Sequence, residues 1–292
     1  MTPPSHPGRY IRHRGVQVPT FIYGTAWKEE RSEALTRMAL ENGFRGIDTA
    51  NQRRHYYEEG VGAAIQKTLA AGHLKREDLF LQSKFTYASA QDHRLPFDPE
   101  ADYAHQVTQS VKSTLAHLHT NYLDAFFLHG PLHPHGFCSA DWEVWRAMEA
   151  LQRKGTIRLI GISNIYPEPL DQLLKQAEVK PAFVQNRCFA RALWDAEVRA
   201  RCRSHDIIYQ GFSLLTANAV ELQNLTVQQI ARRLPCSPAR VIFRFAQQMG
   251  MIPLTGTTDQ AHMQEDLAAY DIQLSKAELA MIENIAAPFQ LR

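Results

Sequence analysis

Short runs rich in β-branched and aromatic residues alternate with longer amphipathic runs along almost the whole chain. The first of these runs are "TFIYGTAW", a predicted helix over residues 29–42, "FRGIDTA", and a predicted helix that begins near Glu58. Such alternation is typical of parallel strands joined by crossover helices. The later strand-like runs are "LFLQSK", "YLDAFFLH", "RLIGISN", "FVQNRCF", "IIYQGFS" and "MIPLTGT". The eight predicted strands are the number that closes a (β/α)8 (TIM) barrel, an α/β fold.

Signals at both ends of the chain complete this prediction. The segment "YIRHRGVQVPT" has a central glycine between alternating apolar residues, so we predict a β-hairpin that closes the bottom of the barrel. Before the last strand, "SPARVIFRFAQQMG" offers Ser237 as an N-cap, then Pro238, and Gly250 at its end, which predicts a helix. Because no linker or repeat interrupts the pattern, we predict one domain over residues 1–292.

The composition narrows the classes of partner. The net charge is +2 and no long block of like charge occurs, so nothing indicates a nucleic-acid or membrane surface. The N-terminal segment lacks the apolar stretch of a signal peptide, and no Cys-x-x-Cys pair occurs. We therefore expect a cytoplasmic protein with a small-molecule substrate, as a monomer or weak homo-oligomer. Its cysteines are widely spaced and are expected to be reduced: Cys138, Cys188, Cys202 and Cys236.

Three successive hydrophobic runs end on residues that can move or hold a proton. "GIDTA" carries Asp48, "LFLQSK" ends at Lys84, and "YLDAFFLH" ends at His129. The carboxyl ends of barrel strands share one rim, where such barrels keep their chemistry. Lys84 lies among apolar neighbours and needs a counter-ion if it is buried, and Asp48 is the natural partner. Each residue alone is explained by a strand-end ion pair or a core histidine, but together they indicate a proton-transfer site.

These residues also carry a family resemblance. "GIDTA", "LQSKF", "YLDAFFLHGP", "GTIRLIGISN" and "IPLTGTT" resemble the aldo-keto reductases in order and spacing, across residues 18–285. The resemblance implies a (β/α) barrel that reduces carbonyl compounds with a nicotinamide coenzyme bound in an extended pose, without a Rossmann domain. It also implies a catalytic tetrad of Asp, Tyr, Lys and His, of which three members map onto Asp48, Lys84 and His129.

The fourth member departs from the family pattern. The catalytic tyrosine of the family lies five residues after the aspartate, and that position here is Arg53. Counting back from the helix near Glu58 reaches His55 without a gap and Tyr56 with one. We take Tyr56 as the proton donor, and Tyr57 and His55 stay open as alternatives.

The tetrad implies a division of labour. A tyrosine is a poor acid at neutral pH, and a lysine ammonium within about 4 to 6 Å lowers such a pKa by roughly 1 to 3 units. We predict that Asp48 keeps Lys84 charged and that Lys84 acidifies Tyr56. His129 is then expected to hydrogen-bond the substrate oxygen and orient it. The hydride comes from the coenzyme.

The resemblance also implies a set of coenzyme contacts. Ser163, Asn164 and Gln185 match the residues that bind the nicotinamide carboxamide, and Phe212 matches the aromatic residue beneath the nicotinamide ring. Thr25, Ser213 and Leu215 are included in the same set.

At the adenosine end the sequence differs from the NADPH-using members. Those members commonly place a Lys and an Arg where this chain has Leu254 and His262. The family preference still favours NADPH, and NADH stays the alternative. Thr255, Gly256 and Thr257 are expected at the phosphates, and Glu265 and Asp266 at the adenine amino group.

On the substrate side we expect Trp27, with Trp194 further off. Residues 87–103 form a long segment rich in Pro and Asp, which we predict to be a lid over the substrate. Aromatic side chains of this kind line pockets for apolar carbonyl compounds, although they also seal barrel rims.

Two rival functions stay open. His129, His133 and His135 form a His-x-x-x-His-x-His cluster, and metal-dependent hydrolases on the same barrel use closely spaced histidines to bind zinc. Pro131 and Pro134 interrupt the cluster, which weighs against one metal centre. The other rival is a barrel that binds the coenzyme without catalysis.

Overall fold

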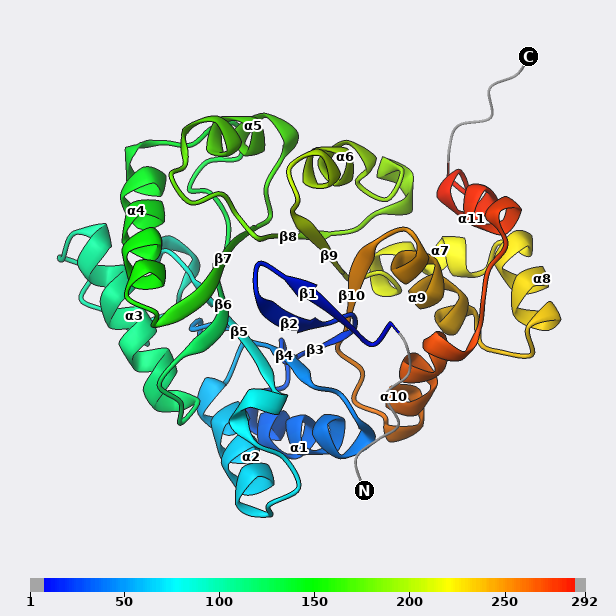
Figure 1. Ribbon diagram of the computed structural model, residues 1–292, viewed down its shortest axis with the longest axis horizontal. Coiled ribbons are helices and arrows are strands. Elements are labelled where there is room, and N and C mark those ends of the chain that lie inside the picture. The colour runs from blue at the N-terminus through cyan, green and yellow to red at the C-terminus, as the bar shows by residue number, and fades with distance from the viewer. Residues whose placement is uncertain (1–7, 287–292) are drawn as a thin grey trace.

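Eight parallel strands form a closed barrel in the computed structural model, which describes residues 8–286 (Figure 1). Neighbouring strands pair in the order β10-β3-β4-β5-β6-β7-β8-β9, and β9 pairs with β10 to close the ring. All eight strands predicted from the sequence are present, so the (β/α)8 prediction is confirmed. Their bounds are β3 Ile22–Gly24, β4 Gly46–Asp48, β5 Phe80–Phe85, β6 Leu123–Leu128, β7 Ile157–Ser163, β8 Phe183–Arg187, β9 Ile208–Phe212 and β10 Met251–Thr255.

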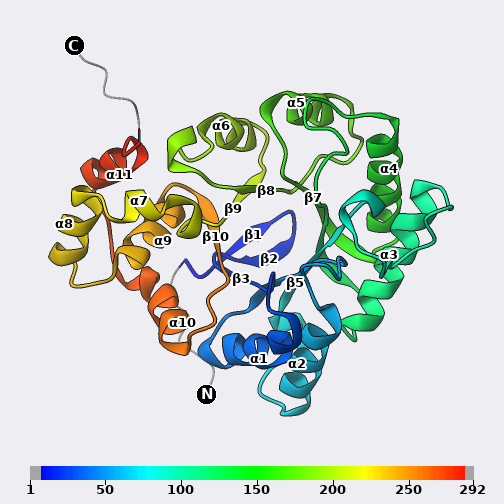
Figure 2. The same cartoon turned by 180° about the vertical axis from the view of Figure 1, so that it is seen from behind.

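Helices surround the barrel on its outside, as Figures 1 and 2 show from opposite ends. The first helix begins later than predicted, because residues 29–31 form a 3-10 turn and Glu29 has a left-handed backbone with φ of 49°. The helices are α1 Ser32–Asn42, α2 Glu58–Ala70, α3 Tyr103–His117, α4 Ser139–Arg153, α5 Pro167–Gln176, α6 Ala196–Ser204, α7 Ala219–Leu222, α8 Leu225–Arg233, α9 Pro238–Gln248, α10 Gln260–Leu267 and α11 Lys276–Glu283.

The predicted helix before the last strand is α9, and its ends follow the sequence signals. The Ser237 hydroxyl accepts a hydrogen bond from the Arg240 backbone N–H at 3.1 Å, and Pro238 is the first helical residue. Gly250, with φ of 78°, then turns the chain into β10. A side-chain cap and a proline at the first position both favour a helix start at this point.

An N-terminal hairpin closes the amino-terminal end of the barrel. Its strands are β1 Tyr10–His13 and β2 Val16–Pro19, which pair antiparallel and lie across the centre of the ring in both views (Figures 1 and 2). Val16 and Val18 pack into the same apolar cluster as Phe80 and Phe183 of the barrel interior. The predicted hairpin is therefore confirmed, and it replaces water beneath the barrel with apolar contacts.

The barrel interior changes from apolar to polar along the strands. Side chains two residues apart on a strand share a face, so Phe80, Gln82 and Lys84 of β5 lie one above another. In the same way Phe183 and Gln185 of β8 share a face. The lower level belongs to the apolar cluster above the hairpin, and the polar level leads to the carboxyl ends of the strands. This gradient delivers polar groups to one rim.

Two further observations concern the described residues alone. The four cysteines are free thiols, and Cys188 and Cys202 are buried. Within residues 8–286, no helix has the length and apolar character needed to cross a membrane.

Candidate active site

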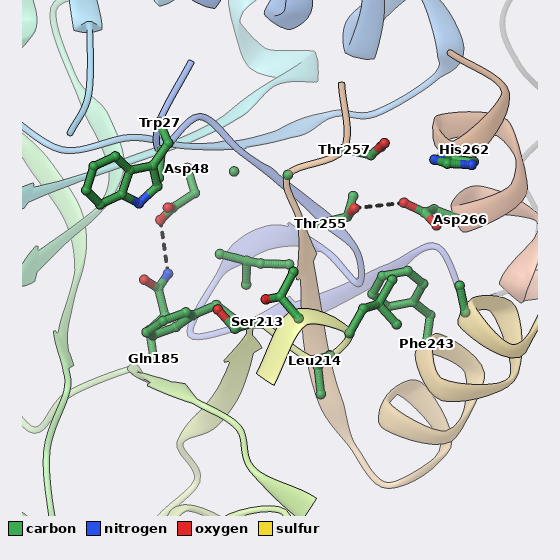
Figure 3. Close-up of a pocket in the computed structure, with 18 of the residues that line it drawn as sticks. Trp27, Asp48, Gln185, Ser213, Leu214, Phe243, Thr255, Thr257, His262 and Asp266 are labelled. Carbon is green, nitrogen blue, oxygen red and sulfur yellow. Dashed lines mark hydrogen bonds between the residues drawn. The ribbon is translucent and has the colours of Figure 1, made fainter. Parts of the chain in front are cut away.

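A cavity of about 630 Å³ opens at the carboxyl-terminal rim of the barrel. Figure 3 shows its long form, with Trp27, Asp48 and Gln185 toward one end and His262, Asp266 and Phe243 toward the other. Tyr56 and His129 also line it, beside Asp48. The rim predicted to carry the chemistry thus holds a cavity, whose lining extends from Asp48 to His262.

Asp48 and Lys84 form a buried ion pair at the wall of this cavity. Lys84 Nζ donates to both carboxylate oxygens of Asp48 at 2.7 Å and to the Thr49 carbonyl at 2.9 Å. The pairing of β4 with β5 sets Asp48 opposite Gln82, one same-face step below Lys84, so the two charges meet across adjacent strands. Burial lowers the pKa of Lys84, and the Asp48 carboxylate opposes that change. The predicted counter-ion is in place.

Tyr56 is the tyrosine that lies against the ion pair. Lys84 Nζ lies 5.3 Å from the centre of the Tyr56 ring, and the His129 ring centre lies 6.0 Å from it. Tyr57 lies instead under the Arg53 guanidinium, and the His55 ring packs on Trp27 at 4.0 Å. Of the three alternatives, the fold brings Tyr56 to Asp48, Lys84 and His129.

The predicted acidification of Tyr56 is not what the environment produces. Burial raises the pKa of the Tyr56 hydroxyl, and the negative charge of Asp48 raises it further. Lys84 Nζ donates to Asp48 and Thr49 and lies 5.3 Å from the centre of the Tyr56 ring, and its charge does not outweigh these two effects on the pKa. Tyr56 therefore holds its proton at neutral pH, and this corrects the sequence-based prediction.

His129 is held as a neutral imidazole. Its Nδ1 lies 2.6 Å from the Thr86 hydroxyl, and its backbone N–H donates to the Phe85 carbonyl at 2.9 Å. Burial and, to a smaller extent, the Lys84 charge lower the pKa of His129 to about 3. A neutral imidazole can donate one hydrogen bond into the cavity without carrying charge.

Ser163, Asn164 and Gln185 form a connected polar wall of the cavity. The Ser163 hydroxyl donates to the Gln185 carbonyl at 2.6 Å, and Asn164 Nδ2 donates to the His129 carbonyl at 2.7 Å. Gln185 Nε2 donates to Asp48 Oδ1 at 3.0 Å, the bond drawn in Figure 3. The amide oxygens of Asn164 and Gln185 accept no hydrogen bond from residues 8–286, so the wall presents free acceptors.

Of the remaining residues predicted at this end, three line the cavity: Phe212, Ser213 and Leu215. Thr25 does not. Its side chain is fully buried, and its hydroxyl donates sideways to the Asp48 carbonyl at 2.9 Å, which ties β3 to β4. Thr25 therefore holds the backbone of Asp48 in place and is not part of the cavity wall.

The far end of the cavity is lined by every residue predicted there: Leu254, Thr255, Gly256, Thr257, His262, Glu265 and Asp266. The Thr255 hydroxyl donates to Asp266 Oδ2 at 2.7 Å (Figure 3), and burial raises the pKa of Asp266 to about 6. Glu265 is already paired with Arg240 at 2.6 Å. The two carboxyl groups are therefore held in place before any ligand binds.

Of the two tryptophans predicted on the substrate side, the structure moves one away from the cavity. Trp194 is fully buried, donates its indole N–H to the Ile282 carbonyl at 2.9 Å and packs on Phe245, so it belongs to the core. Trp27 does line the cavity and is 67% exposed at its mouth. Its contact with His55 leaves one face of the indole ring for a ligand.

The predicted lid does not cover the large cavity. Residues 87–103 contribute none of its lining. They are fixed to the segment that carries Tyr56, since Gln52 Nε2 donates to the Ala90 carbonyl at 2.7 Å and Gln91 Nε2 to the Asn51 carbonyl at 2.8 Å. Tyr87 is buried and donates to Asp141 at 2.7 Å. The segment lines a smaller cavity of about 340 Å³ behind Tyr56 instead.

The histidine cluster does not converge on one centre. His129 contacts Thr86, His133 forms an isolated β-bridge with Gly136, and His135 stacks on Tyr166. In the part of the chain that the structure describes, no group of three metal-ligating side chains could hold an ion. The geometry therefore gives the metal-dependent hydrolase no support.

Sequence reasoning missed three polar residues of the site. Lys28 lines the cavity and donates to the Gly256 carbonyl, while Gln82 and Gln210 lie buried beneath Asp48 and Gln185. The signal for the glutamines was present: Gln82 lies two residues before Lys84, and Gln210 two before Phe212. Residues two apart on a strand share its face, so both amides had to point into the barrel.

Comparison with known proteins agrees with this geometry. The family model described as "Aldo/keto reductase family" matches residues 20–287. Glyoxal reductase of Bacillus subtilis is 31% identical over 93% of this chain and 90% of its own length. The crystal structure of an aldo/keto reductase from Brucella melitensis is 25% identical and superposes with a TM-score of 0.81 over 94% of this chain and 98% of that one.

An aldo-keto reductase from Bombyx mori, solved in complex with NADP, shares the fold with a TM-score of 0.80 at 22% identity, over 94% of this chain and 92% of that one. The chain belongs to the aldo/keto reductase family, whose members are oxidoreductases that use nicotinamide coenzymes. The resemblance read from the sequence is confirmed.

Proposed function

We propose that this protein reduces aldehydes or ketones to alcohols with a nicotinamide coenzyme. The observation that carries the proposal is the placement of Tyr56 and His129 on the cavity wall, directly against the buried Asp48–Lys84 pair. A phenol, a neutral imidazole and a fixed positive charge around one point suit a carbonyl oxygen that gains negative charge.

The polar wall fits a nicotinamide ring. The amide oxygens of Asn164 and Gln185 accept no hydrogen bond from the described residues 8–286, which suits a carboxamide with two N–H donors. Phe212 supplies a flat apolar face in the same cavity. A bound reduced nicotinamide would supply the hydride that the carbonyl carbon takes up.

The residues of the tetrad then have separate tasks. Tyr56 keeps its proton until the carbonyl oxygen becomes basic, because burial raises its pKa. Lys84 stabilises the phenolate left behind, and Asp48 holds Lys84 charged and in position. His129 donates a hydrogen bond that orients the carbonyl oxygen, as a neutral imidazole.

We propose NADPH as the coenzyme, with NADH as the alternative. Apart from His129, the basic side chains that line the cavity among the described residues are Lys28 and His262, and both are available to phosphate groups. The complex of the Bombyx mori relative with NADP agrees with this preference. One observation opposes the choice of NADPH: Leu254 lines the cavity, and its side chain cannot bind a phosphate group.

The test is to measure whether the purified protein turns over a panel of carbonyl compounds, with the oxidation of NADPH or NADH as the readout. Glyoxal belongs in the panel because a relative is named glyoxal reductase. We expect coenzyme oxidation that depends on both the carbonyl compound and Tyr56. Tight binding of the coenzyme with no turnover across the panel would contradict catalysis and favour a barrel that binds the coenzyme without using it.

A further inference from the structure

The two ring nitrogens of His129 have different surroundings. Nδ1 lies 2.6 Å from the hydroxyl oxygen of Thr86. Nε2 makes no hydrogen bond within residues 8–286 and is not among the buried polar atoms that lack a partner there, so it is open to solvent. His129 lines the large cavity and Thr86 does not. Nδ1 is therefore held from behind the cavity wall, and Nε2 is the ring nitrogen left for a ligand.

The pairing of β5 with β6 brings Thr86 and His129 together. Phe85 lies opposite Leu128 in the register of these strands, and Thr86 and His129 are the next residues in line. The His129 backbone N–H donates to the Phe85 carbonyl at 2.9 Å, which continues the pairing beyond the strand ends. Thr86 lies two residues after Lys84, so the two side chains share the inward face. The contact is thus set by the barrel itself.

The Thr86 hydroxyl has one use for its proton. Among residues 8–286 its Oγ1 contacts His129 Nδ1 alone, and Thr86 is 3% exposed. If Nδ1 carried a proton and donated it, the hydroxyl proton would be buried without an acceptor, which is unfavourable. If Nδ1 accepts instead, the hydroxyl proton is satisfied. The geometry therefore favours a Thr86 hydroxyl that donates to a bare Nδ1.

This contact decides where the imidazole carries its own proton. A neutral imidazole holds one proton, on one of its two nitrogens. His129 is neutral because burial and the nearby Lys84 charge lower its pKa. When the hydrogen bond at Nδ1 makes that nitrogen an acceptor, the proton lies on Nε2. Nε2 is then a donor and not an acceptor.

We propose that Thr86 is a positioning residue that holds His129 in the tautomer with its proton on Nε2, and so makes the imidazole a hydrogen-bond donor to the carbonyl oxygen of the substrate. The proposal rests on the proposed function. Thr86 acts through His129, since it contributes nothing to the cavity wall. In the other tautomer a bare Nε2 would present its lone pair to an oxygen that gains negative charge, and the two would repel each other.

The direct test is nitrogen NMR at neutral pH on the protein with isotope-labelled histidine, because protonated and bare ring nitrogens differ widely in chemical shift. His129→Gln identifies the His129 signals by their absence. We expect the unaltered protein to show a bare Nδ1 and a protonated Nε2 at His129. A protonated Nδ1 overturns the proposal, whether or not the protein reduces carbonyl compounds.

Three threonine variants test the role of the hydroxyl. Thr86→Val keeps the shape of the side chain but removes the donor, so the proton is no longer excluded from Nδ1. We expect the second tautomer to appear and kcat to fall about tenfold, the size of one hydrogen bond, with an unchanged dissociation constant for the coenzyme. Thr86→Ser restores the donor and should keep both the tautomer and kcat. The matched control is Thr36→Val, at a buried threonine of α1 whose hydroxyl has no partner among the described residues, and it should change neither.

An unchanged tautomer in folded Thr86→Val overturns the positioning role, whatever the value of kcat. If Thr86→Val does not fold, the spectrum of the unaltered protein still decides the tautomer, and a second tautomer in Thr86→Ser counts against the proposal. A complete lack of turnover in the unaltered protein contradicts the proposed function instead, so the two failures are distinguishable.

Discussion

Lys84 Nζ lies 2.7 Å from each carboxylate oxygen of Asp48, and the lysine and aspartate side chains are 1% and 5% exposed. The pair joins β4 to β5 at the wall of the cavity. Removing one partner of a buried pair leaves an uncompensated charge. A substitution at either residue should therefore lower both the free energy of unfolding and the rate of carbonyl reduction.

Replacing Lys84 with Met should abolish most carbonyl reduction. We expect kcat to fall at least about 100-fold, because the phenolate of Tyr56 loses its stabilising charge. The free energy of unfolding should fall by about 3 to 5 kcal/mol, because Asp48 is left unpaired. Turnover and urea unfolding measure the two effects. Lys75→Met, at a lysine that is 79% exposed, should change neither, and near-normal turnover in Lys84→Met would rule out the scheme.

Phenylalanine substitutions separate the candidate proton donors. Tyr56→Phe should lower kcat by about 100-fold or more while the dissociation constant of the coenzyme stays unchanged, because one proton donor is lost. Tyr57→Phe is the matched control and should retain activity, since its ring lies under Arg53. His55→Ala should alter mainly KM through its contact with Trp27. A large loss of kcat in Tyr57→Phe with little loss in Tyr56→Phe would reverse the assignment.

Burial of Asp266 should make stability depend on pH. Its pKa is raised from 3.8 to about 6, so the native state holds this proton more tightly than the unfolded chain. Stability is then fully present below about pH 4 and is lost as the pH rises toward about 6. Asp266→Asn should therefore match the unaltered protein near pH 4 and exceed it by roughly 3 kcal/mol near pH 7, by urea unfolding at each pH.

The control for this prediction is Asp259→Asn at the N-cap of α10. The backbone N–H of His262 lowers the pKa of Asp259, so its contribution is lost as the pH falls through that lowered value. Its replacement should leave the slope between about pH 4 and about pH 6 unchanged. Equal slopes for Asp266→Asn and the unaltered protein would contradict the assignment to Asp266.

Gly62 on α2 should tolerate no side chain. A Cβ atom there would lie 1.8 Å from the His117 carbonyl oxygen at the end of α3, so the two helices must separate. We expect Gly62→Ala to lower the melting temperature and to cost about 3 kcal/mol. Gly60→Ala, two residues earlier with its nearest contact at 3.1 Å, is the matched control and should cost far less. Equal costs would show that the close approach does not limit the packing.

His262 should contribute to coenzyme preference. We expect the unaltered protein to bind NADPH more tightly than NADH, and His262→Ala to lower that ratio severalfold, about the effect of one hydrogen bond to a charged group. Titration of each coenzyme gives the dissociation constants, and His205→Ala on an exposed turn is the control. A clear preference for NADH in the unaltered protein would overturn the proposed coenzyme.

The amino-acid order determined the barrel and most of its rim. Eight strand-like runs alternate with helical ones, and parallel strands put their carboxyl ends on one side, so Asp48, Lys84 and His129 had to share a rim. The hairpin and α9 followed from local turn and cap signals, which depend on neighbouring residues. That residues 1–292 form one domain stays a prediction.

The tertiary structure determined which side chains face the site and how burial changes their pKa values, and local sequence signals do not predict either. Of Tyr56, Tyr57 and His55, the one that lies beside Asp48 and Lys84 is set by the path of the segment after β4, which is fixed by hydrogen bonds to residues 87–103. Because of those bonds, residues 87–103 pack behind Tyr56 and do not form the predicted lid. A hydrogen bond to the Ile282 carbonyl likewise holds Trp194 in the core. The raised pKa of Tyr56 depends on burial. Contacts between residues that are distant in the sequence form only when the barrel folds, and only then is water excluded from the site. The periodicity of the sequence therefore predicted which residues lie at the rim, while packing set the orientation of their side chains and their pKa values.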